Sequence, residues 1–251
     1  MHTTTDEGVL YITFDRPESL NAFNGEEATA LADAVADAEP GSHDAVVLTG
    51  KGEAFSAGGD IEAMAEREET PRAAYERYNR TYGRVAEELF RCPVPVVAKI
   101  NGDAVGAGLA VTALSDFAYA VETATFGCAF VHVGLIPDTG GSYLLPKLVG
   151  LRAAKRLAFT GEYFDATEAA DLGLITETVS ADELDSRVSA LLDTLGDRPT
   201  ETIALAKEAI HNNLGRQWDD ARDHETMLQI QAYGSKSHEE GVAEFLSDGS
   251  E

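Results

Sequence analysis

The sequence predicts an α/β fold in which strands, turns and helices alternate and an all-helical part follows. Short apolar or alternating runs, typical of strands, recur through the first two-thirds of the chain, each followed by a turn and a helical segment. From about Ala181 onward the pattern is helical, with Pro199 as the one break. At 251 residues the chain can bury a full core. We expect a strand-containing core over residues 1–190 and a helical annex over residues 191–251.

The elements of the core are predicted from their periodicity and from the residues that end them. Residues 9–14 alternate as a half-buried strand does, and residues 45–49 form the short apolar run of a buried strand. Pro40 and Gly41 end the helix between these two strands. Further strands are expected at 94–100, 117–121, 125–126 and 174–179, and helices at about 24–38, 61–91, 106–115, 142–149 and 152–159.

The charge balance is strongly acidic. The chain has 44 acidic and 19 basic residues, a formal net charge of −25. Nucleic acid and anionic membrane surfaces are therefore poor partners, because each would be repelled. The acidic residues are spread along predicted helix faces, which favours adaptation to high salt, where charges are screened within roughly 3 Å at molar ionic strength. An ordinary acidic protein is the alternative interpretation.

The sequence gives no sign of secretion, a membrane span or a metal site. Cys92 and Cys128 lack the spacing of a disulfide framework, which favours a reducing compartment. The N-terminal residues are neither basic nor apolar, so we expect no signal peptide and a cytoplasmic protein. The longest apolar region, 94–121, is interrupted by polar residues and glycines and is not expected to cross a bilayer. The six histidines form no metal-spaced pair, and His132 is interpreted as a core or surface residue.

Two glycine-rich turns are the strongest functional signal in the chain. The first, FSAGGDI at Phe55–Ile61, follows the strand at 45–49, and Ala57 to Gly59 leave the backbone almost bare. The second, NGDAVGAGL at Asn101–Leu109, lies between a strand and a helix. Two such turns can aim two peptide N–H groups at one oxygen. They predict an oxyanion hole, which stabilises negative charge developing on a carbonyl oxygen.

Two later motifs extend the pattern, GLIPDTGGSY at Gly134–Tyr143 and LGLITE at Leu172–Glu177. In order and spacing, the four motifs resemble the crotonase (enoyl-CoA hydratase/isomerase) superfamily, from about Val9 to about Leu246. The resemblance implies a crotonase (ClpP-like) spiral of repeated ββα units with a C-terminal all-helical oligomerisation region. It also implies a homotrimer or a dimer of trimers, an acyl-CoA thioester as the substrate, and no permanently bound cofactor.

The resemblance also assigns roles to single residues. The oxyanion donors fall on the backbone N–H groups of Gly59 and Ala107. Enoyl-CoA hydratases use two glutamates, and the matching positions are Ala110 and Phe130, which carry no exchangeable side-chain proton. Asp138 stands where phenylacetate-pathway isomerases, which the surrounding motif resembles most, carry an aspartate. We therefore expect a double-bond or ring isomerase with Asp138 as acid/base and with its pKa raised by apolar neighbours.

Other interpretations stay open at this point. Asp138 is alternatively a helix N-cap, since a helix is expected shortly after it. An enoyl-CoA hydratase with weak or non-standard catalysis is another alternative, as is a catalytically silent CoA-binding subunit. Aryl-CoA dehalogenases carry an aspartate nucleophile at this position. They fit less well, because Phe130 and about Glu87 replace their tryptophan and histidine.

Coenzyme A and the acyl group are placed by the same resemblance. Backbone around Ala22, Ala57 and Gly59 is expected to hold the adenine, and Arg16 and Lys236 are candidate phosphate contacts. The acidic C-terminal residues 246–251 replace the basic tail that closes over coenzyme A in many relatives.

Three aromatic residues, Phe126, Phe130 and Tyr143, are candidates to line the acyl pocket. An aromatic or ring-shaped acyl group would fit such a lining. Buried aromatic side chains serve as well in an ordinary core.

Overall fold

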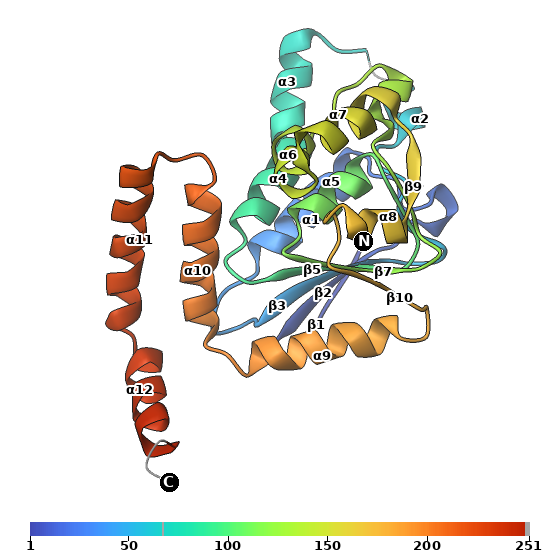
Figure 1. The fold of residues 1–251 in the computed structure, drawn as a ribbon. Helices are drawn as coiled ribbons and strands as arrows, with labels where there is room; N and C mark the ends of the chain where they lie inside the picture. Colours follow the sequence, from blue (N-terminus) through green and yellow to red (C-terminus); the bar gives the residue numbers. More distant parts are fainter. Residues whose placement is uncertain (67, 249–251) are drawn as a thin grey trace.

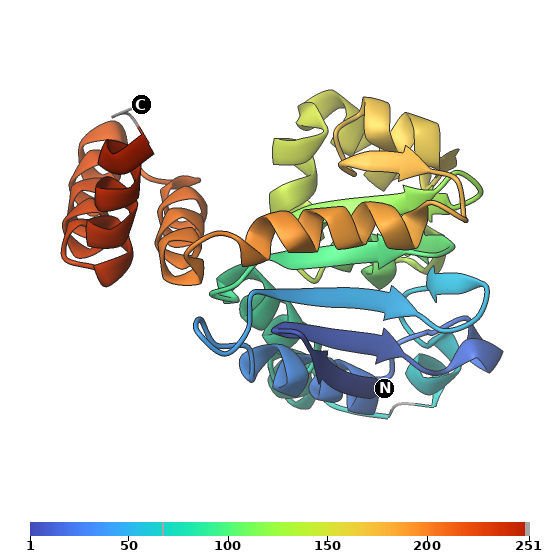
Figure 2. The same ribbon diagram turned by 90° about the horizontal axis from the view of Figure 1, so that it is seen from below.

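The computed structural model describes residues 1–66 and 68–248, and a six-stranded sheet runs through that part of the chain (Figures 1 and 2). Its order is β1 (His2–Asp6), β2 (Val9–Phe14), β3 (Ala45–Gly50), β5 (Val96–Ile100), β7 (Phe117–Val121), β10 (Glu177–Val179). β1 is antiparallel to β2, and the other neighbouring strands are parallel. Parallel neighbours require crossover connections, which the helices supply.

A smaller sheet continues from the carboxyl ends of these strands. It consists of β4 (Ala54–Ser56), β6 (Asp103–Val105), β8 (Thr125–Gly127) and β9 (Tyr163–Asp165), with β9 antiparallel to β8. β3, β5 and β7 are each followed by one short strand of this sheet and then by a helical segment. This repetition brings the turns after β4 and β6 to the same edge of the molecule, because β4 pairs with β6.

Helices cover both faces of the large sheet (Figure 1). α1 (Gly25–Ala36), α4 (Tyr82–Arg91) and α5 (Ala107–Leu114) lie on one side and α9 (Leu184–Gly196) on the other. α5 is buried along its whole length because its residues are almost all small or apolar. The other helical segments of the core are η1 (Pro17–Ser19), α2 (Ile61–Ala65), α3 (Pro71–Arg80), η2 (Ala129–Val133), α6 (Gly141–Leu148), α7 (Gly150–Thr160) and α8 (Ala166–Asp171).

The last three helices extend away from the core (Figures 1 and 2). They are α10 (Thr200–Asn213), α11 (Trp218–Tyr233) and α12 (Lys236–Asp248). Lys207 ties α10 to the core, since its Nζ donates to Asp116 at 2.6 Å and to the Val94 carbonyl oxygen at 3.0 Å. The boundary predicted at residue 190 falls inside α9, whose Leu184 and Val188 are buried. The segment that stands apart therefore begins at α10.

The predicted elements agree with the structure except where elements are short or polar. The sequence analysis missed the strands β1, β4, β6 and β9 and the short helical segments η1, η2 and α8, and the strand expected at 174–179 shortens to β10. β1 is exposed along its length and consists mostly of threonine, so no apolar pattern marks it. The helical stretch expected at 61–91 divides into α2, α3 and α4.

None of the helices over residues 1–66 and 68–248 is both long and apolar enough to cross a membrane. The same residues contain no group of three or more His, Cys, Asp and Glu side chains arranged to hold a metal ion. Cys92 and Cys128 are both buried, reduced thiols.

Candidate active site

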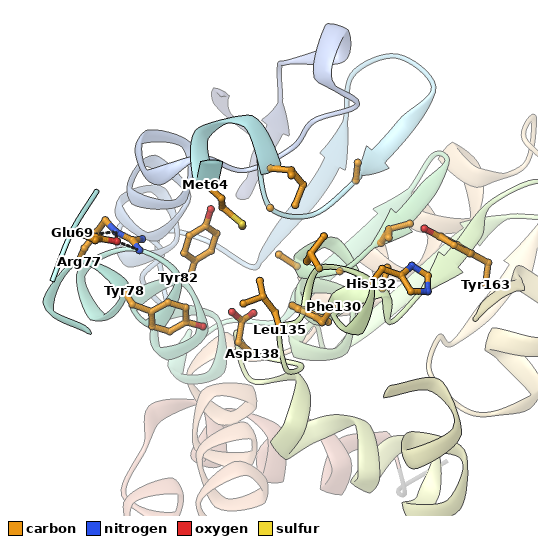
Figure 3. Close-up of a pocket in the computed structure, with 18 residues that line it drawn as sticks. Met64, Glu69, Arg77, Tyr78, Tyr82, Phe130, His132, Leu135, Asp138 and Tyr163 are labelled. Carbon is orange, nitrogen blue, oxygen red and sulfur yellow. Dashed lines mark hydrogen bonds and ion pairs between the residues drawn. The ribbon is translucent and has the colours of Figure 1, made fainter. Parts of the chain in front are cut away.

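A cavity of about 600 Å³ lies where the two glycine-rich turns meet (Figure 3). One wall is the turn after β4 and the start of α5, and another is η2 with the loop that follows it. Helices α2, α3 and α4 close the remaining side. The cavity is thus built from segments that are distant in sequence and that the repeated ββα units bring together.

The Gly59 N–H faces this cavity because of how Gly59 pairs. Gly59 forms a parallel bridge with Phe23, in which the Phe23 N–H donates to the Gly58 carbonyl oxygen at 2.6 Å and the Asp60 N–H donates to the Phe23 carbonyl oxygen at 2.8 Å. The neighbours of Gly59 therefore make the bonds, and its own N–H points the other way. Gly59 lines the cavity, and its N–H has no hydrogen-bond acceptor among the described residues.

The second donor, the Ala107 N–H, is the first of helix α5. Amides in the first turn of a helix have no acceptor within the helix, and the positive end of the helix dipole adds to their attraction for anions. Ala107 lines the same cavity as Gly59. Two N–H groups on one cavity wall are the arrangement that an oxyanion hole requires.

The two turns are locked together at Gly58. Its φ is +93°, and a Cβ there would lie 2.6 Å from the Val105 carbonyl oxygen and 3.0 Å from the Ala107 nitrogen. Only glycine permits both the backbone conformation and the close approach. The buried Ser56 hydroxyl fixes the turn further, accepting from the Gly58 N–H at 3.1 Å and donating to the Asn21 carbonyl oxygen at 2.9 Å. The relative position of the two donors is therefore set by packing.

Asp138 is the carboxylate beside these donors. It lies in the turn between η2 and α6, half-buried, and lines the cavity next to Leu135 (Figure 3). Burial raises the pKa of the Asp138 carboxyl, while hydrogen bonds from the Thr139 and Tyr78 hydroxyls act in the opposite direction. The Thr139 Oγ1 donates to Asp138 Oδ1 at 3.0 Å. The apolar neighbours expected from the sequence are Phe130, Leu135 and Ile136; Phe130 and Leu135 line the cavity, whereas Ile136 is 74% exposed.

The N-cap alternative for Asp138 is wrong. Helix α6 begins at Gly141, its N-cap is Gly140 in a left-handed conformation with φ +81°, and no side chain caps it. Asp138 contributes only its backbone carbonyl oxygen to this turn, accepting from the Gly141 N–H at 2.7 Å. The Asp138 side chain is therefore available to the cavity.

Tyr78, which the sequence analysis did not select, positions Asp138. It lies on α3, stacks on Tyr82 with ring centroids 5.8 Å apart, and accepts from the Thr139 N–H at 3.1 Å. Burial and the nearby Asp138 charge raise the pKa of Tyr78 to about 12. The Tyr78 hydroxyl therefore stays protonated and donates a hydrogen bond to the Asp138 carboxylate. Thr139 has φ +49°, a strained conformation for a β-branched residue that these hydrogen bonds hold in place.

No carboxylate stands at the two hydratase glutamate positions. Ala110 is fully buried in α5, and Phe130 lines the cavity. Among the described residues of the cavity wall, the carboxylates are Asp138 and Glu69, and Glu69 is paired with Arg77. Asp138 is therefore the carboxylate among the described cavity residues that has no basic partner there.

The predicted coenzyme A contacts divide into two groups. Ala57 and Gly59 line the cavity. Arg16 does not, since its Nη1 donates to the Ala22 carbonyl oxygen at 2.9 Å and to Asp60 at 3.0 Å, so it braces the first glycine-rich turn. Its pKa is raised by the hydrogen bond to Asp60.

Lys236 lies on α12, distant from the cavity (Figure 1). It is paired with Glu240 at 2.7 Å. The C-terminal tail expected to lack a basic cluster falls partly on residues 249–251, which lie outside the described residues.

Two of the three aromatic residues expected to line the acyl pocket do not line the cavity. Phe130 lines the cavity, but Phe126 is fully buried in the core against Phe164. Tyr143 lies on α6 outside the cavity, 45% exposed and edge-on to Phe90. The alternation along β8 turns Phe126 inward, which the short predicted strand could have indicated. His132, by contrast, lies at the cavity wall.

Comparison with known proteins agrees with this geometry. The "Enoyl-CoA hydratase/isomerase" family model matches residues 4–250. The chain belongs to the enoyl-CoA hydratase/isomerase family. A probable enoyl-CoA hydratase of Rhodobacter capsulatus is 35% identical over 241 residues, covering 96% of this chain and 92% of the relative. The 1,2-epoxyphenylacetyl-CoA isomerase of Escherichia coli is 34% identical over 251 residues, covering 96% and 93%.

A solved structure gives the same result for the fold. The enoyl-CoA hydratase of Mycobacterium smegmatis superposes with a TM-score of 0.92 at 30% identity, covering 98% of this chain and 96% of that one. The predicted crotonase fold is thereby confirmed. Enzymes of the enoyl-CoA hydratase/isomerase family act on CoA thioesters without a permanent cofactor. Because the relatives are named both as hydratases and as an isomerase, membership alone does not select the reaction.

Proposed function

We propose that the protein is an acyl-CoA isomerase that shifts a double bond or opens a strained ring, with Asp138 as acid/base. One observation carries this proposal. Among the described residues, one cavity-lining carboxylate, Asp138, has no cationic partner, and it lines the same cavity as the two backbone donors, Gly59 and Ala107. That set of groups suffices for moving one proton between two carbons of a thioester-activated chain.

The reaction for a 3-enoyl-CoA follows from these groups. The thioester oxygen accepts hydrogen bonds from the Gly59 and Ala107 N–H groups, which makes the C2 proton more acidic. Asp138 takes that proton, and the C2–H electron pair becomes an enolate that is conjugated with the double bond. The protonated Asp138 then returns the proton to C4, which leaves the double bond between C2 and C3. Burial favours both half-reactions, because it brings the pKa of Asp138 nearer to the working pH.

Hydration is less well supported by the site. Adding water to a conjugated double bond requires groups that hold and deprotonate the water, and Ala110 and Phe130 cannot do so. The dehalogenase alternative is also weak, because Glu87 is exposed on α4 and pairs with Arg91 at 2.7 Å. A silent CoA-binding subunit would not need Asp138 to be buried next to the oxyanion donors.

The proposal extends to the identity of the acyl group, the binding site for coenzyme A and the assembly. The Escherichia coli relative named 1,2-epoxyphenylacetyl-CoA isomerase supports a ring-epoxide substrate of the phenylacetate pathway as well as a linear enoyl chain. The backbone around Ala22, Ala57 and Gly59 stays our proposal for the adenine site. The assembly we propose is a homotrimer or a dimer of trimers.

Large apolar side chains on the extended helices support that assembly, since they are exposed in the single chain. They include Trp218 at 75%, Ile230 at 65% and Phe245 at 80% exposure. Light scattering at several salt concentrations would measure the mass of the particle. A mass of three or six chains is the expected outcome, and a monomer at all concentrations would contradict the assembly.

Product analysis tests the reaction. With a 3-enoyl-CoA in deuterium oxide, we expect a 2-enoyl-CoA of unchanged elemental composition that carries deuterium from the solvent. With a 2-enoyl-CoA, we expect little 3-hydroxyacyl-CoA. A product that has gained water would show a hydratase, and a substrate that is neither converted nor exchanges a proton would show a silent subunit.

A further inference from the structure

Residues 16–23 form a strap that runs along the first glycine-rich turn. Two neighbours in this strap, Leu20 and Asn21, have φ angles of +51° and +58°, left-handed values that are uncommon for residues other than glycine. Such strain persists only where the surrounding structure fixes it, and it concentrates at functional sites. Leu20 is 49% exposed, whereas Asn21 is 2% exposed. A buried polar side chain therefore lies at the strained point of the strap.

The side-chain amide of Asn21 links three backbone groups. Its Oδ1 accepts from the Arg16 N–H at 2.9 Å, and its Nδ2 donates to the carbonyl oxygens of Lys51 at 3.0 Å and Ala54 at 2.8 Å. These partners fix the orientation of the amide, because an N–H faces one end and two carbonyl oxygens face the other. Lys51 and Ala54 lie at the two ends of the connection between β3 and β4. Asn21 thus ties the strap to the strand that leads into the turn.

The backbone of the strap is bonded to the turn itself. The Asn21 carbonyl oxygen accepts from the Ser56 hydroxyl at 2.9 Å. The Leu20 carbonyl oxygen accepts from the Ala57 N–H at 2.9 Å. The two left-handed residues of the strap therefore present both of their carbonyl oxygens to the glycine-rich turn, and a change in their conformation would release both bonds.

A further bond from the strap sets the direction of the Gly59 N–H. The Phe23 N–H donates to the Gly58 carbonyl oxygen at 2.6 Å. This oxygen and the Gly59 N–H belong to one planar trans peptide, so they point in opposite directions. Because Phe23 holds the oxygen toward the strap, the N–H is turned toward the cavity that Gly59 lines. A displaced strap would rotate this peptide and misdirect the donor.

We propose that Asn21 is a positioning residue for the oxyanion donor Gly59. Asn21 does not line the cavity, so it acts through the strap rather than on the substrate. Asparagine suits this position because it tolerates the left-handed backbone and supplies both an acceptor and a donor. The inference rests on the proposed function only in assigning the thioester oxygen to Gly59 and Ala107. It does not depend on whether Asp138 moves a proton.

The absorbance of bound cinnamoyl-CoA tests the position of the donor separately from catalysis. The phenyl ring of this thioester is conjugated with the carbonyl group, so hydrogen bonds to the carbonyl oxygen move the absorption to longer wavelength. At saturation, we expect such a shift with the unmodified protein and a smaller one with Asn21→Gly. Cinnamoyl-CoA has no hydrogen at C4, so a failure of the isomerase proposal leaves this result readable.

Glycine at position 21 keeps the left-handed backbone and removes only the amide. With a 3-enoyl-CoA, kcat of Asn21→Gly should fall by about 10- to 100-fold and KM should change less, as expected when a transition-state donor is displaced. The matched control is Glu7→Gly, at an exposed residue with φ +45° in the turn between β1 and β2. It should leave the absorption shift and kcat unchanged.

If Asn21→Gly does not fold, Asn21→Asp replaces it, since a carboxylate still accepts from the Arg16 N–H but cannot donate to the two carbonyl oxygens. A full absorption shift in a folded Asn21 variant would overturn the proposal, as would an equal loss of the shift in Glu7→Gly. Absence of the shift in the unmodified protein would overturn the oxyanion assignment and this inference with it.

Discussion

Burial and hydrogen bonding act on the Asp138 carboxyl in opposite directions. Loss of water raises its pKa, and the Tyr78 and Thr139 hydroxyls partly offset that rise by binding the charged form. In the proposed reaction this carboxylate both accepts and returns a proton. Each side of this balance can be altered by one substitution.

The first prediction concerns Asp138→Asn. We expect isomerisation to fall by about 10²- to 10⁴-fold, because asparagine cannot take up a proton. The folded chain should be no less stable at neutral pH. The raised pKa means that ionised Asp138 destabilises the fold, and this penalty is absent below the ordinary carboxyl pKa and complete above the raised one. The measurements are kcat and urea unfolding.

The matched control is Asp193→Asn, at an exposed position of α9, which should leave kcat unchanged. A fully active Asp138→Asn variant would remove Asp138 from the reaction. A variant that loses both activity and stability would instead indicate a structural role.

The second prediction concerns Tyr78→Phe. The hydroxyl lowers the pKa of Asp138 by donating to its charged form, so removing it should raise that pKa. The acid limb of kcat/KM should then move to higher pH, as expected for the loss of one hydrogen bond to a charge. Tyr75→Phe, 71% exposed on the same helix, is the control and should not move the limb. A shift to lower pH would contradict this role of Tyr78.

At this scale the sequence selected the proposed reacting groups but not the residue that positions one of them. Gly59, Ala107 and Asp138 lie in motifs, and the structure brings all three to one cavity. Tyr78 lies in no such motif, and its contact with Thr139 spans 61 positions of the chain. The tyrosines at helical spacing were visible in the sequence, but only the folded chain shows which of them faces Asp138.

The interlocked turns after β4 and β6 act as one unit. Pairing of β4 with β6 sets their separation, and Gly58 allows the backbones to touch. This unit holds both oxyanion donors, so its geometry and the stability of the fold are linked.

The third prediction is that Gly58→Ala destabilises the fold by roughly 2–4 kcal/mol and abolishes activity. An alanine Cβ would add backbone strain at φ +93° to a contact of 2.6 Å with the Val105 carbonyl oxygen. Gly41→Ala separates these two effects, because Gly41 has φ +84° with nothing within 4 Å of the added Cβ. We expect Gly41→Ala to lose only about 1 kcal/mol in urea unfolding. Equal losses at the two positions would show that close approach is unimportant.

The elements that the sequence analysis missed have a common physical cause. Strands of three residues, such as β6 and β9, are too short for a period of two to be visible. β6 lies inside the second glycine-rich motif, where bare backbone suggested a turn. Long apolar elements, such as β3 and α5, were predicted close to their bounds because burial selects their residues.

The whole molecule carries a charge that its own ion pairs cannot neutralise. With 44 acidic and 19 basic residues, at least 25 carboxylates remain without a basic side chain of their own. Self-repulsion at this charge opposes compact folding until salt screens it.

The fourth prediction is that unfolding in urea requires more denaturant as potassium chloride rises toward molar concentration. Screening within roughly 3 Å at that ionic strength removes most repulsion between surface carboxylates. A sucrose series of matched osmolality is the control. Sucrose is excluded from the protein surface, as stabilising salts are, but it does not screen charge. A midpoint that does not change with salt, or that follows sucrose equally, would contradict high-salt adaptation.

Transfer of one label within the substrate tests most directly whether a single carboxylate serves both carbons. A 3-enoyl-CoA deuterated at C2 would be converted in ordinary water and the product analysed by NMR. We predict that part of the deuterium appears at C4, since Asp138 carries it there before exchanging with solvent, and that Asp138→Asn forms almost no product. Loss to water of all the deuterium that is removed from C2, at a rate that the substitution does not change, would contradict the account.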